Sequence, residues 1–231
     1  MKIKYLYNSG FVIEKDDLAI VIDAHIPKEK DFLWNELESS ILNKEKIYFL
    51  VSHGHHDHYE EDIFKYKKEN VKYILEKNVT NEKKEDVKYL KKGDIFDDGT
   101  LKIKAYGSTD EGISFYIEVE GIKIFHSGDL NWWHWTGETK AEREFAERFF
   151  MEEINAIEEK DFDYGFFPID PRQGEAYYYG AKYFLEQFKV KNYIPMHFRE
   201  DFALQIEFKD LMEREDINFL KVEEEGKYIE I

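Results

Sequence analysis

The feature that constrains this chain most is an apolar strand pattern that runs directly into a cluster of histidines. The run KIYFLV, residues 46–51, ends at Ser52, and four of the chain's eight histidines follow within six positions in SHGHHDH. A continuous apolar run of this length is typical of a buried strand in an α/β sheet. The loop that leaves the carboxyl end of such a strand is a common place for chemistry. We therefore predict a strand, a functional loop and then a helix over residues 59–70.

The rest of the chain alternates strand and helix patterns. We predict a three-stranded meander over residues 3–23, with turns at 8–10 and 15–17, followed by a helix over 32–42. Period-two patterns predict antiparallel strands over 101–108 and 113–129, with a tight turn at Glu120-Gly121. A helix over 138–159, a strand over 163–170, a helix over 176–188, a strand over 191–197 and a last helix with strands complete the α/β pattern. No linker interrupts it, so we expect one domain over residues 1–231.

Composition narrows the function classes. The chain has 50 acidic and 33 basic side chains, a formal charge of -17, and no cysteine. This field repels phosphate backbones and anionic membranes, so we expect a small-molecule substrate, with neither a nucleic acid nor a membrane as partner. The N-terminus lacks a signal-peptide pattern, and no apolar run reaches membrane-spanning length, which favours a cytoplasmic location. Aromatic residues make up 17% of the chain, enough to leave room for a homo-oligomer interface as well as a core.

The histidine cluster has the spacing of a metal site. In the pattern H-x-H-x-D-H, alternate loop residues can point the same way, so His53 and His55 can converge on one ion while Asp57 and His58 serve a neighbouring one. Imidazole and carboxylate suit zinc, iron or manganese, and the absence of cysteine excludes thiolate sites. A chance histidine-rich loop, or one that caps a helix, is the alternative.

SHGHHDH resembles the signature of the metallo-β-lactamase fold superfamily. Later segments resemble that family's motifs in the same order: FHSGD supplies Asp129, and PMHF supplies His197. Asp23, at the end of LAIVID, resembles an early aspartate that braces the metal loop. The resemblance implies an α/β (α+β) fold, a four-layer αββα sandwich, with a two-metal site.

What the resemblance implies for the site can be given residue by residue. Site one would take His53 and His55, site two would take Asp57, His58 and His197, and Asp129 would bridge. The implied activity is a metal-dependent hydrolase, with one or two divalent ions, Zn²⁺ first and Mn²⁺ or Fe as alternatives, that acts on a small-molecule ester, lactone or phosphodiester. A metal-bound hydroxide would be the nucleophile, and Asp57 would orient it.

One ligand of the resembled pattern is missing. No histidine precedes the hairpin, where the sequence reads AYGSTDEGISF, and Asp110 is the replacement that charge favours. A turn role for Asp110 is the alternative. His134, which follows Asp129 closely, is a second replacement or an acid that protonates the leaving group. The gap also motivates a competing function, a catalytically reduced protein that binds a metal or a ligand.

Neighbouring residues complete the predicted pocket. Trp132 and Trp133 follow Asp129 directly, so we expect indole rings to line the site, with a core or interface cluster as the alternative. Arg172 is predicted to hold a carboxylate or phosphate of the substrate, or else to form an ordinary salt bridge. His126 is predicted to orient Asp129, or to have a buried structural role.

Overall fold

The described residues fold into two compact units, each with its own sheet. The computed structural model describes residues 1–66, 68–81 and 83–231. Unit 1 comprises residues 1–90 and 222–231, and unit 2 comprises residues 91–221. The expected single domain over residues 1–231 stays a prediction.

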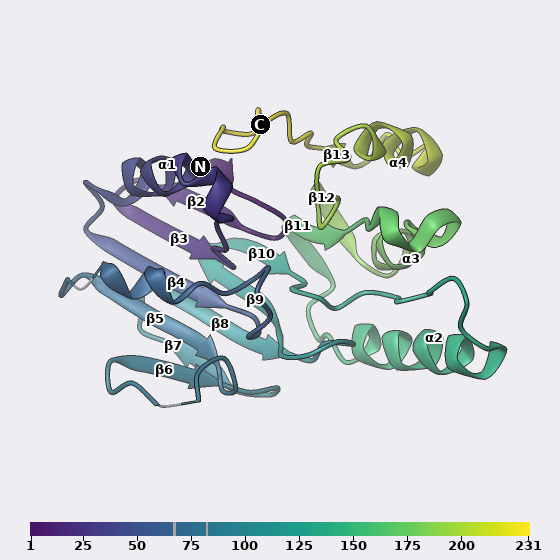
Figure 1. Ribbon diagram of the computed structural model, residues 1–231, viewed down its shortest axis with the longest axis horizontal. Helices are drawn as coiled ribbons and strands as arrows, with labels where there is room; N and C mark the ends of the chain where they lie inside the picture. The colour runs from purple at the N-terminus through teal and green to yellow at the C-terminus, as the bar shows by residue number, and fades with distance from the viewer. Residues whose placement is uncertain (67, 82) are drawn as a thin grey trace. The chain divides into compact units, whose positions relative to one another are not determined.

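The sheet of unit 1 begins as a meander and continues as parallel strands. Its order is β1-β2-β3-β4-β5-β6, with β1 to β3 antiparallel and β3 to β6 parallel. The predicted meander is confirmed, and so is a helix near residue 32, which lies beside β2 in Figure 1. The elements are β1 (Lys2–Tyr5), β2 (Phe11–Lys15), β3 (Leu18–Ile22), η1 (Lys28–Lys30), α1 (Phe32–Ile41), β4 (Lys46–Val51), η2 (Glu61–Lys65), β5 (Val71–Glu76) and β6 (Val87–Leu90).

The helix predicted over residues 59–70 is wrong. The described part of that segment contains only the short 3-10 helix η2, Glu61–Lys65, and residue 67 lies outside the described residues. Ile63 is the one fully buried side chain of η2. One buried residue gives too little packing to stabilise a longer helix, because helices in proteins depend on an apolar face. The strands β5 and β6 that follow were not predicted.

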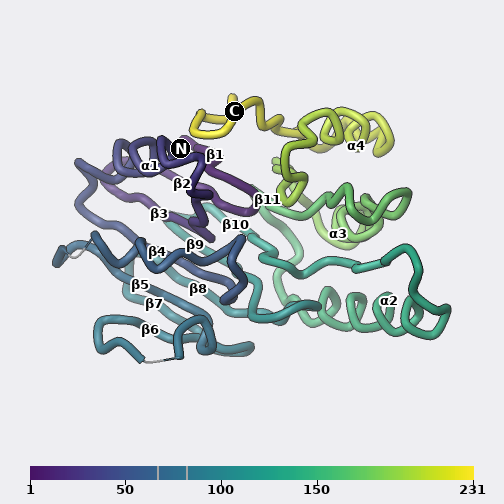
Figure 2. The backbone as a smooth tube through the Cα atoms, in the orientation of Figure 1, coloured from purple at the N-terminus to yellow at the C-terminus, as the bar shows by residue number. Residues whose placement is uncertain are grey.

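The segment over residues 222–231 returns to the edge of the unit 1 sheet. Tyr5 N donates to Lys227 O at 3.1 Å, and Ile229 N donates to Ile3 O at 2.8 Å. Figure 2 shows the two ends of the chain side by side. The segment therefore covers β1, which would otherwise expose the hydrogen-bonding groups of an edge strand.

The sheet of unit 2 has the order β13-β12-β11-β10-β9-β8-β7, and β10 to β13 are parallel. The predicted hairpin is confirmed, with φ of 49° at Glu120 and 78° at Gly121, as a type I′ turn requires. The elements are β7 (Ile95–Asp97), β8 (Leu101–Tyr106), β9 (Ser114–Val119), β10 (Ile122–His126), α2 (Lys140–Asn155), β11 (Asp161–Pro168), η3 (Pro171–Ala176), α3 (Tyr179–Gln187), β12 (Lys189–Met196), α4 (Leu204–Met212) and β13 (Asn218–Phe219).

Aromatic side chains fill the core of unit 2. Phe184 on α3 stacks on Phe167 of β11 at 4.6 Å between ring centroids and on Phe125 of β10 at 5.4 Å. Figure 1 shows α3 beside β11. All three rings are fully buried, so they belong to the core of unit 2. Within the described chain, no helix is both long and apolar enough to cross a membrane.

Candidate metal centre

In unit 1, the predicted residues gather where two parallel strands end. Asp23 follows β3, and Ser52 and His53 follow β4, which pairs with β3 in parallel. The ladder continues into the loop, because Asp23 N donates to Leu50 O at 2.9 Å. Asp23 has φ of 45°, a left-handed conformation that aspartate tolerates better than most residues. Its side chain is thereby held within the buried end of the sheet.

The carboxylate of Asp23 organises this loop. Oδ1 accepts a hydrogen bond from Ser52 N at 2.7 Å, and Oδ2 accepts from Ser52 Oγ at 2.7 Å and from His58 Nδ1 at 2.9 Å. All three side chains are buried. Because the carboxylate takes the proton-bearing Nδ1 of His58, the lone pair of that ring lies on Nε2. This is the arrangement in which a histidine binds a metal.

His53 and His55 bring two ring nitrogens together. His53 Nε2 lies 3.1 Å from His55 Nδ1, and His53 Nδ1 lies 3.0 Å from Ser52 Oγ. Two imidazole nitrogens at this separation need a shared proton or a cation between their lone pairs. Alternate residues of the loop therefore do point the same way, as the spacing predicted.

Asp57 and His25 lie next to these histidines. Asp57 Oδ2 accepts a hydrogen bond from Asn8 Nδ2 at 3.1 Å. His25 is mostly buried, with Nδ1 3.5 Å from Glu60 Oε2 and its ring 6.3 Å from that of His56. Burial lowers the pKa of His25, although the Glu60 carboxylate opposes the shift. Burial therefore favours the neutral form of His25.

In unit 2, two of the predicted metal ligands follow strands of the parallel part of the sheet. Asp129 follows β10, and His197 follows β12, which are separated only by β11. His197 Nε2 lies 3.5 Å from Asp129 Oδ1, and both residues are buried. His197 has φ of 62°, which is uncommon for a residue other than glycine and is frequent at functional sites. The unit thus brings together its two expected ligands.

Asp170 is a site residue that the sequence reasoning missed. It follows β11 and is fully buried, and its Oδ2 accepts a hydrogen bond from His197 Nδ1 at 2.8 Å. Burial raises its pKa, but the hydrogen bonds from His197 and Arg172 outweigh burial and lower the pKa to about 2. The signal was available, because the strand pattern DYGFFPID ends in Ile-Asp at Asp170, as LAIVID ends in Ile-Asp at Asp23.

Arg172 is engaged by the same carboxylate. Its Nε lies 2.9 Å from Asp170 Oδ2, and its backbone N donates to Asp170 Oδ1 at 2.9 Å. The guanidinium also lies 5.3 Å from the ring centroid of Trp135. Arg172 thus forms a salt bridge with a buried acid, and contact with substrate stays a prediction.

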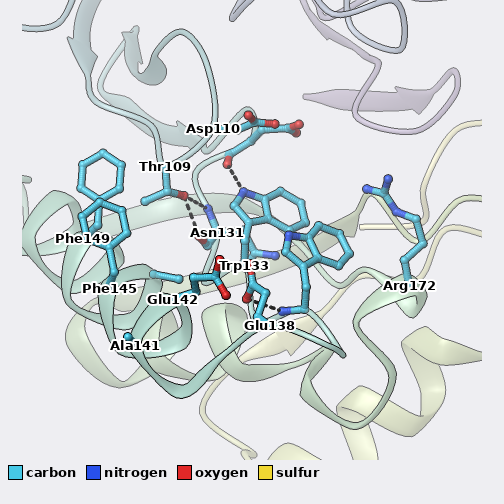
Figure 3. Close-up of a pocket in the computed structure, with 13 residues that line it drawn as sticks. Thr109, Asp110, Asn131, Trp133, Glu138, Ala141, Glu142, Phe145, Phe149 and Arg172 are labelled. Carbon is cyan, nitrogen blue, oxygen red and sulfur yellow. Dashed lines mark hydrogen bonds between the residues drawn. The ribbon is translucent and has the colours of Figure 1, made fainter.

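In the loop over residues 130–139, some side chains pack into the core and others line a cavity. Trp133 lines a cavity of about 560 Å³, whereas Trp132 packs against Phe150 at 6.1 Å and does not line it. The indole N–H of Trp133 donates to Asp129 O at 3.1 Å, as Figure 3 shows. His134 packs edge-on against Tyr179 at 5.5 Å and is likewise not part of the cavity wall. Trp133 is therefore the predicted indole that faces the space beside Asp129.

The remaining predicted residues are Asp110 and His126. Asp110 is exposed on the bend before Gly112 and lines the cavity together with Asp129 (Figure 3). His126 is buried, and its Nδ1 accepts a hydrogen bond from Gly128 N at 3.2 Å. The bend role of Asp110 is thus visible, while ligation by Asp110 and the orientation of Asp129 by His126 stay predictions.

The donor atoms of both units fit a divalent metal. Each unit holds a buried histidine whose Nδ1 is bound by a buried carboxylate: His58 by Asp23, and His197 by Asp170. Nitrogen and oxygen donors without thiolate suit zinc, manganese or iron.

Comparison with known proteins identifies the family. A model described as the beta-lactamase superfamily domain matches residues 2–142. A UPF0173 metal-dependent hydrolase from Alkaliphilus metalliredigens is 28% identical over 147 residues, which cover 56% of this chain and 63% of that relative, less than two thirds of its length.

Two solved structures show the same fold. A protein from Parabacteroides distasonis, named as a metal-dependent hydrolase, has a TM-score of 0.65 and 19% identity, over 94% of this chain and 90% of that one. A metallo hydrolase from the hyperthermophilic archaeon Ignicoccus hospitalis has a TM-score of 0.63 and 17% identity, over 98% and 96%. The expected α/β fold of the metallo-β-lactamase type is confirmed. Since the family model matches more than half of its residues, the chain belongs to the beta-lactamase superfamily.

Proposed function

We propose that this protein is a metal-dependent hydrolase that acts on a small-molecule ester, lactone or phosphodiester. The observation that carries the proposal is the pair of buried contacts in which Asp23 holds His58 Nδ1 at 2.9 Å and Asp170 holds His197 Nδ1 at 2.8 Å. A carboxylate bound to the far nitrogen is the usual support of a metal-ligating histidine, because it orients the ring and raises its basicity. The names of the relatives agree with the proposal.

The proposed metal ligands are assigned residue by residue. We assign them by the family motifs that this chain retains, and by the local geometry described for each unit. Zn²⁺ is the proposed metal, as one or two ions, with Mn²⁺ or Fe as alternatives that the same donors accept. The ligands are His53, His55, Asp57, His58, Asp129 and His197, with Asp110 as an additional ligand.

In the proposed mechanism, the chain's own residues hold the reactants and move protons. When bound, a divalent metal supplies Lewis acidity and lowers the pKa of water. Asp57, which Asn8 holds by a hydrogen bond at 3.1 Å, orients the attacking water. Trp133 forms an apolar wall beside Asp129 and limits access of bulk water. His134 is the proposed acid for the leaving group, and it must turn away from Tyr179 to act.

The proposed substrate is a small molecule rather than a nucleic acid or a lipid surface. The formal charge of -17 supports this choice, because an acidic surface repels polyanions.

The first test joins metal content to activity. Protein purified without a histidine tag is analysed for metals by mass spectrometry, loaded with zinc or manganese, and assayed on panels of esters, lactones and phosphodiesters. We expect at least one bound ion and hydrolysis in one panel. Asp57→Ala and His58→Ala should abolish turnover while circular dichroism shows an intact fold. Variants that hydrolyse as well as the wild type would contradict the assignment, and tight ligand binding without turnover at any metal loading would favour a binding protein.

A further inference from the structure

The cavity beside Asp129 has a composition that restricts the substrate. It measures about 560 Å³, the size of a site for a drug-sized molecule. Its wall combines aromatic rings and carboxylates from the loop after β10, from α2 and from the bend before β9 (Figure 3). The lining residues are Thr109, Asp110, Asp129, Asn131, Trp133, Trp135, Glu138, Ala141, Glu142, Phe145, Ala146, Phe149 and Arg172.

Two aromatic pairs form the apolar part of the wall. Trp133 and Trp135 stack with an interplanar angle of 5° at 5.3 Å. Phe145 and Phe149, one turn apart on α2, lie 5.8 Å from each other, and Phe145 is 57% exposed. Figure 3 shows these two phenyl rings on the far side of Glu142 from Trp133. When an apolar ligand covers an exposed aromatic pair in a cavity, apolar surface is removed from water, and this favours binding.

The polar part of the wall is predominantly negative. Glu138 and Glu142 contribute carboxylates apart from Asp110 and Asp129, which are proposed metal ligands. Hydrogen bonds from the backbone and side chain of Thr139 lower the pKa of Glu142, so that this group is ionised at neutral pH. Among the described residues that line the cavity, Arg172 is the one cationic side chain, and its guanidinium is bound to Asp170. An anionic substituent would meet several carboxylates and an arginine that is already neutralised.

We infer that this cavity binds an organic cation, an aryl or alkyl group that carries an ammonium. Aromatic faces attract a cation through their quadrupole, and the carboxylates add Coulombic attraction. The inference rests on the proposed hydrolase function and specifies its substrate class. The preferred substrate is an ester or lactone with a cationic apolar substituent. Substrates with a neutral substituent bind less tightly, and substrates with an anionic substituent are rejected.

Binding to the metal-free protein tests the cavity apart from the chemistry. Three probes share a benzyl group: benzyltrimethylammonium, benzyl alcohol and phenylacetate. Their dissociation constants are measured by quenching of tryptophan fluorescence and by calorimetry. We expect the cation to bind about threefold to tenfold more tightly than the alcohol, the range of an exposed to partly desolvated cation–π contact, and phenylacetate to bind most weakly. Phenylacetate binding as tightly as the cation overturns the inference.

Matched variants locate the binding. Phe145→Ala combined with Phe149→Ala should weaken benzyltrimethylammonium at least threefold, whereas Phe32→Ala, at a 51% exposed phenylalanine of α1, should leave it unchanged. Glu138→Gln should reduce the preference for the cation over the alcohol, and Glu45→Gln, at an exposed acid of unit 1, should not. Equal effects of the variants and their controls overturn the inference.

The two proposals fail separately. If the probes bind in the expected order but zinc-loaded or manganese-loaded protein hydrolyses nothing in the ester, lactone and phosphodiester panels, esters of an ammonium alcohol included, the cavity inference is supported and the hydrolase proposal fails. If esters are hydrolysed without preference for the cation, the cavity inference fails.

Discussion

His197 donates a hydrogen bond from Nδ1 to Asp170 Oδ2 at 2.8 Å, and both side chains are buried. The same carboxylate accepts a charge-assisted hydrogen bond from Arg172 Nε. The Asp170 side chain that orients His197 is therefore itself held in place by Arg172. His58 and Asp23 repeat the relationship in unit 1 at 2.9 Å. Each unit therefore orients one expected metal ligand by the same device.

Asp170→Asn should weaken metal binding while the protein still folds. The amide keeps the shape of the side chain but removes the charge that holds His197 and Arg172. Loss of such a partner typically costs 10-fold to 100-fold in metal affinity, which competition with a chromogenic chelator measures. Asp161→Asn is the control, since Asp161 pairs with Lys123 at 2.6 Å with its side chain 61% exposed. Unchanged affinity in Asp170→Asn would show that His197 needs no such support.

Asp23→Asn should reduce stability more than most single changes. Asparagine tolerates the φ of 45°, so the substitution tests the three hydrogen bonds to Ser52 and His58 rather than the backbone. We expect a loss of about 1–3 kcal/mol in the free energy of unfolding, measured by urea denaturation of metal-free protein. Asp31→Asn, on the connection before α1, should change it little. Equal stability of the two variants would exclude a structural role for the Asp23 charge.

Gly180→Ala should displace the loop that carries the tryptophans. A Cβ at Gly180 would collide with Asn131 Oδ1 and lie 2.9 Å from Trp132 N. Asn131 cannot move freely, since its Nδ2 donates to Gln173 Oε1 at 3.0 Å. We expect about 1–3 kcal/mol of destabilisation from the overpacking and a shifted tryptophan emission spectrum. Lys182→Ala, at an exposed position of α3, provides the comparison, and an unshifted spectrum in Gly180→Ala would mean that the loop is positioned by other contacts.

Glu14 should make unit 1 sensitive to acid. Burial raises the pKa of Glu14, but hydrogen bonds from Tyr228, Ser40 and Lys44 outweigh it and lower the pKa below its ordinary 4.5. A group with a lowered pKa in the folded state stabilises the protein above its unfolded pKa, and this contribution is lost as pH falls below about 4.5.

Urea denaturation between pH 7 and pH 3 measures that contribution. At pH 7, Glu14→Gln should have a smaller free energy of unfolding than the wild type. On acidification, the free energy of unfolding of Glu14→Gln should fall less than that of the wild type. Glu45→Gln, at an exposed position, should follow the wild-type profile. Parallel profiles for Glu14→Gln and the wild type would be the contrary result.

Much of the strand pattern could be predicted because buried strand positions are occupied by apolar residues. KIYFLV has five buried residues of six, and the hairpin turn at Glu120-Gly121 needs positive φ at both positions. The helix predicted over 138–159 contains α2, whose start is fixed by a capping box between Thr139 and Glu142. The segment over residues 59–70 failed because its charged and aromatic residues fit a helix pattern, while only Ile63 of η2 is buried deeply enough to stabilise one.

The site was predicted as far as its residue types are distinctive. Histidines clustered after a strand indicate metal chemistry, but a single aspartate such as Asp170 resembles an ordinary turn residue until the neighbouring strand places His197 beside it. Spacing could not separate Trp133 from Trp132, because only tertiary packing decides which ring faces the cavity and which faces Phe150.

The return of residues 222–231 to strand β1 has a consequence for biosynthesis. In the sequence, unit 2 lies between the two parts of unit 1. The second part supplies the hydrogen bonds to β1, such as the one that Gly226 N donates to Tyr5 O at 2.8 Å. On the ribosome, the first 90 residues emerge early but wait for their edge partner until all of unit 2 has been translated. During that interval β1 is an open strand edge, so we expect the nascent chain to be prone to misassociation until residues 222–231 arrive.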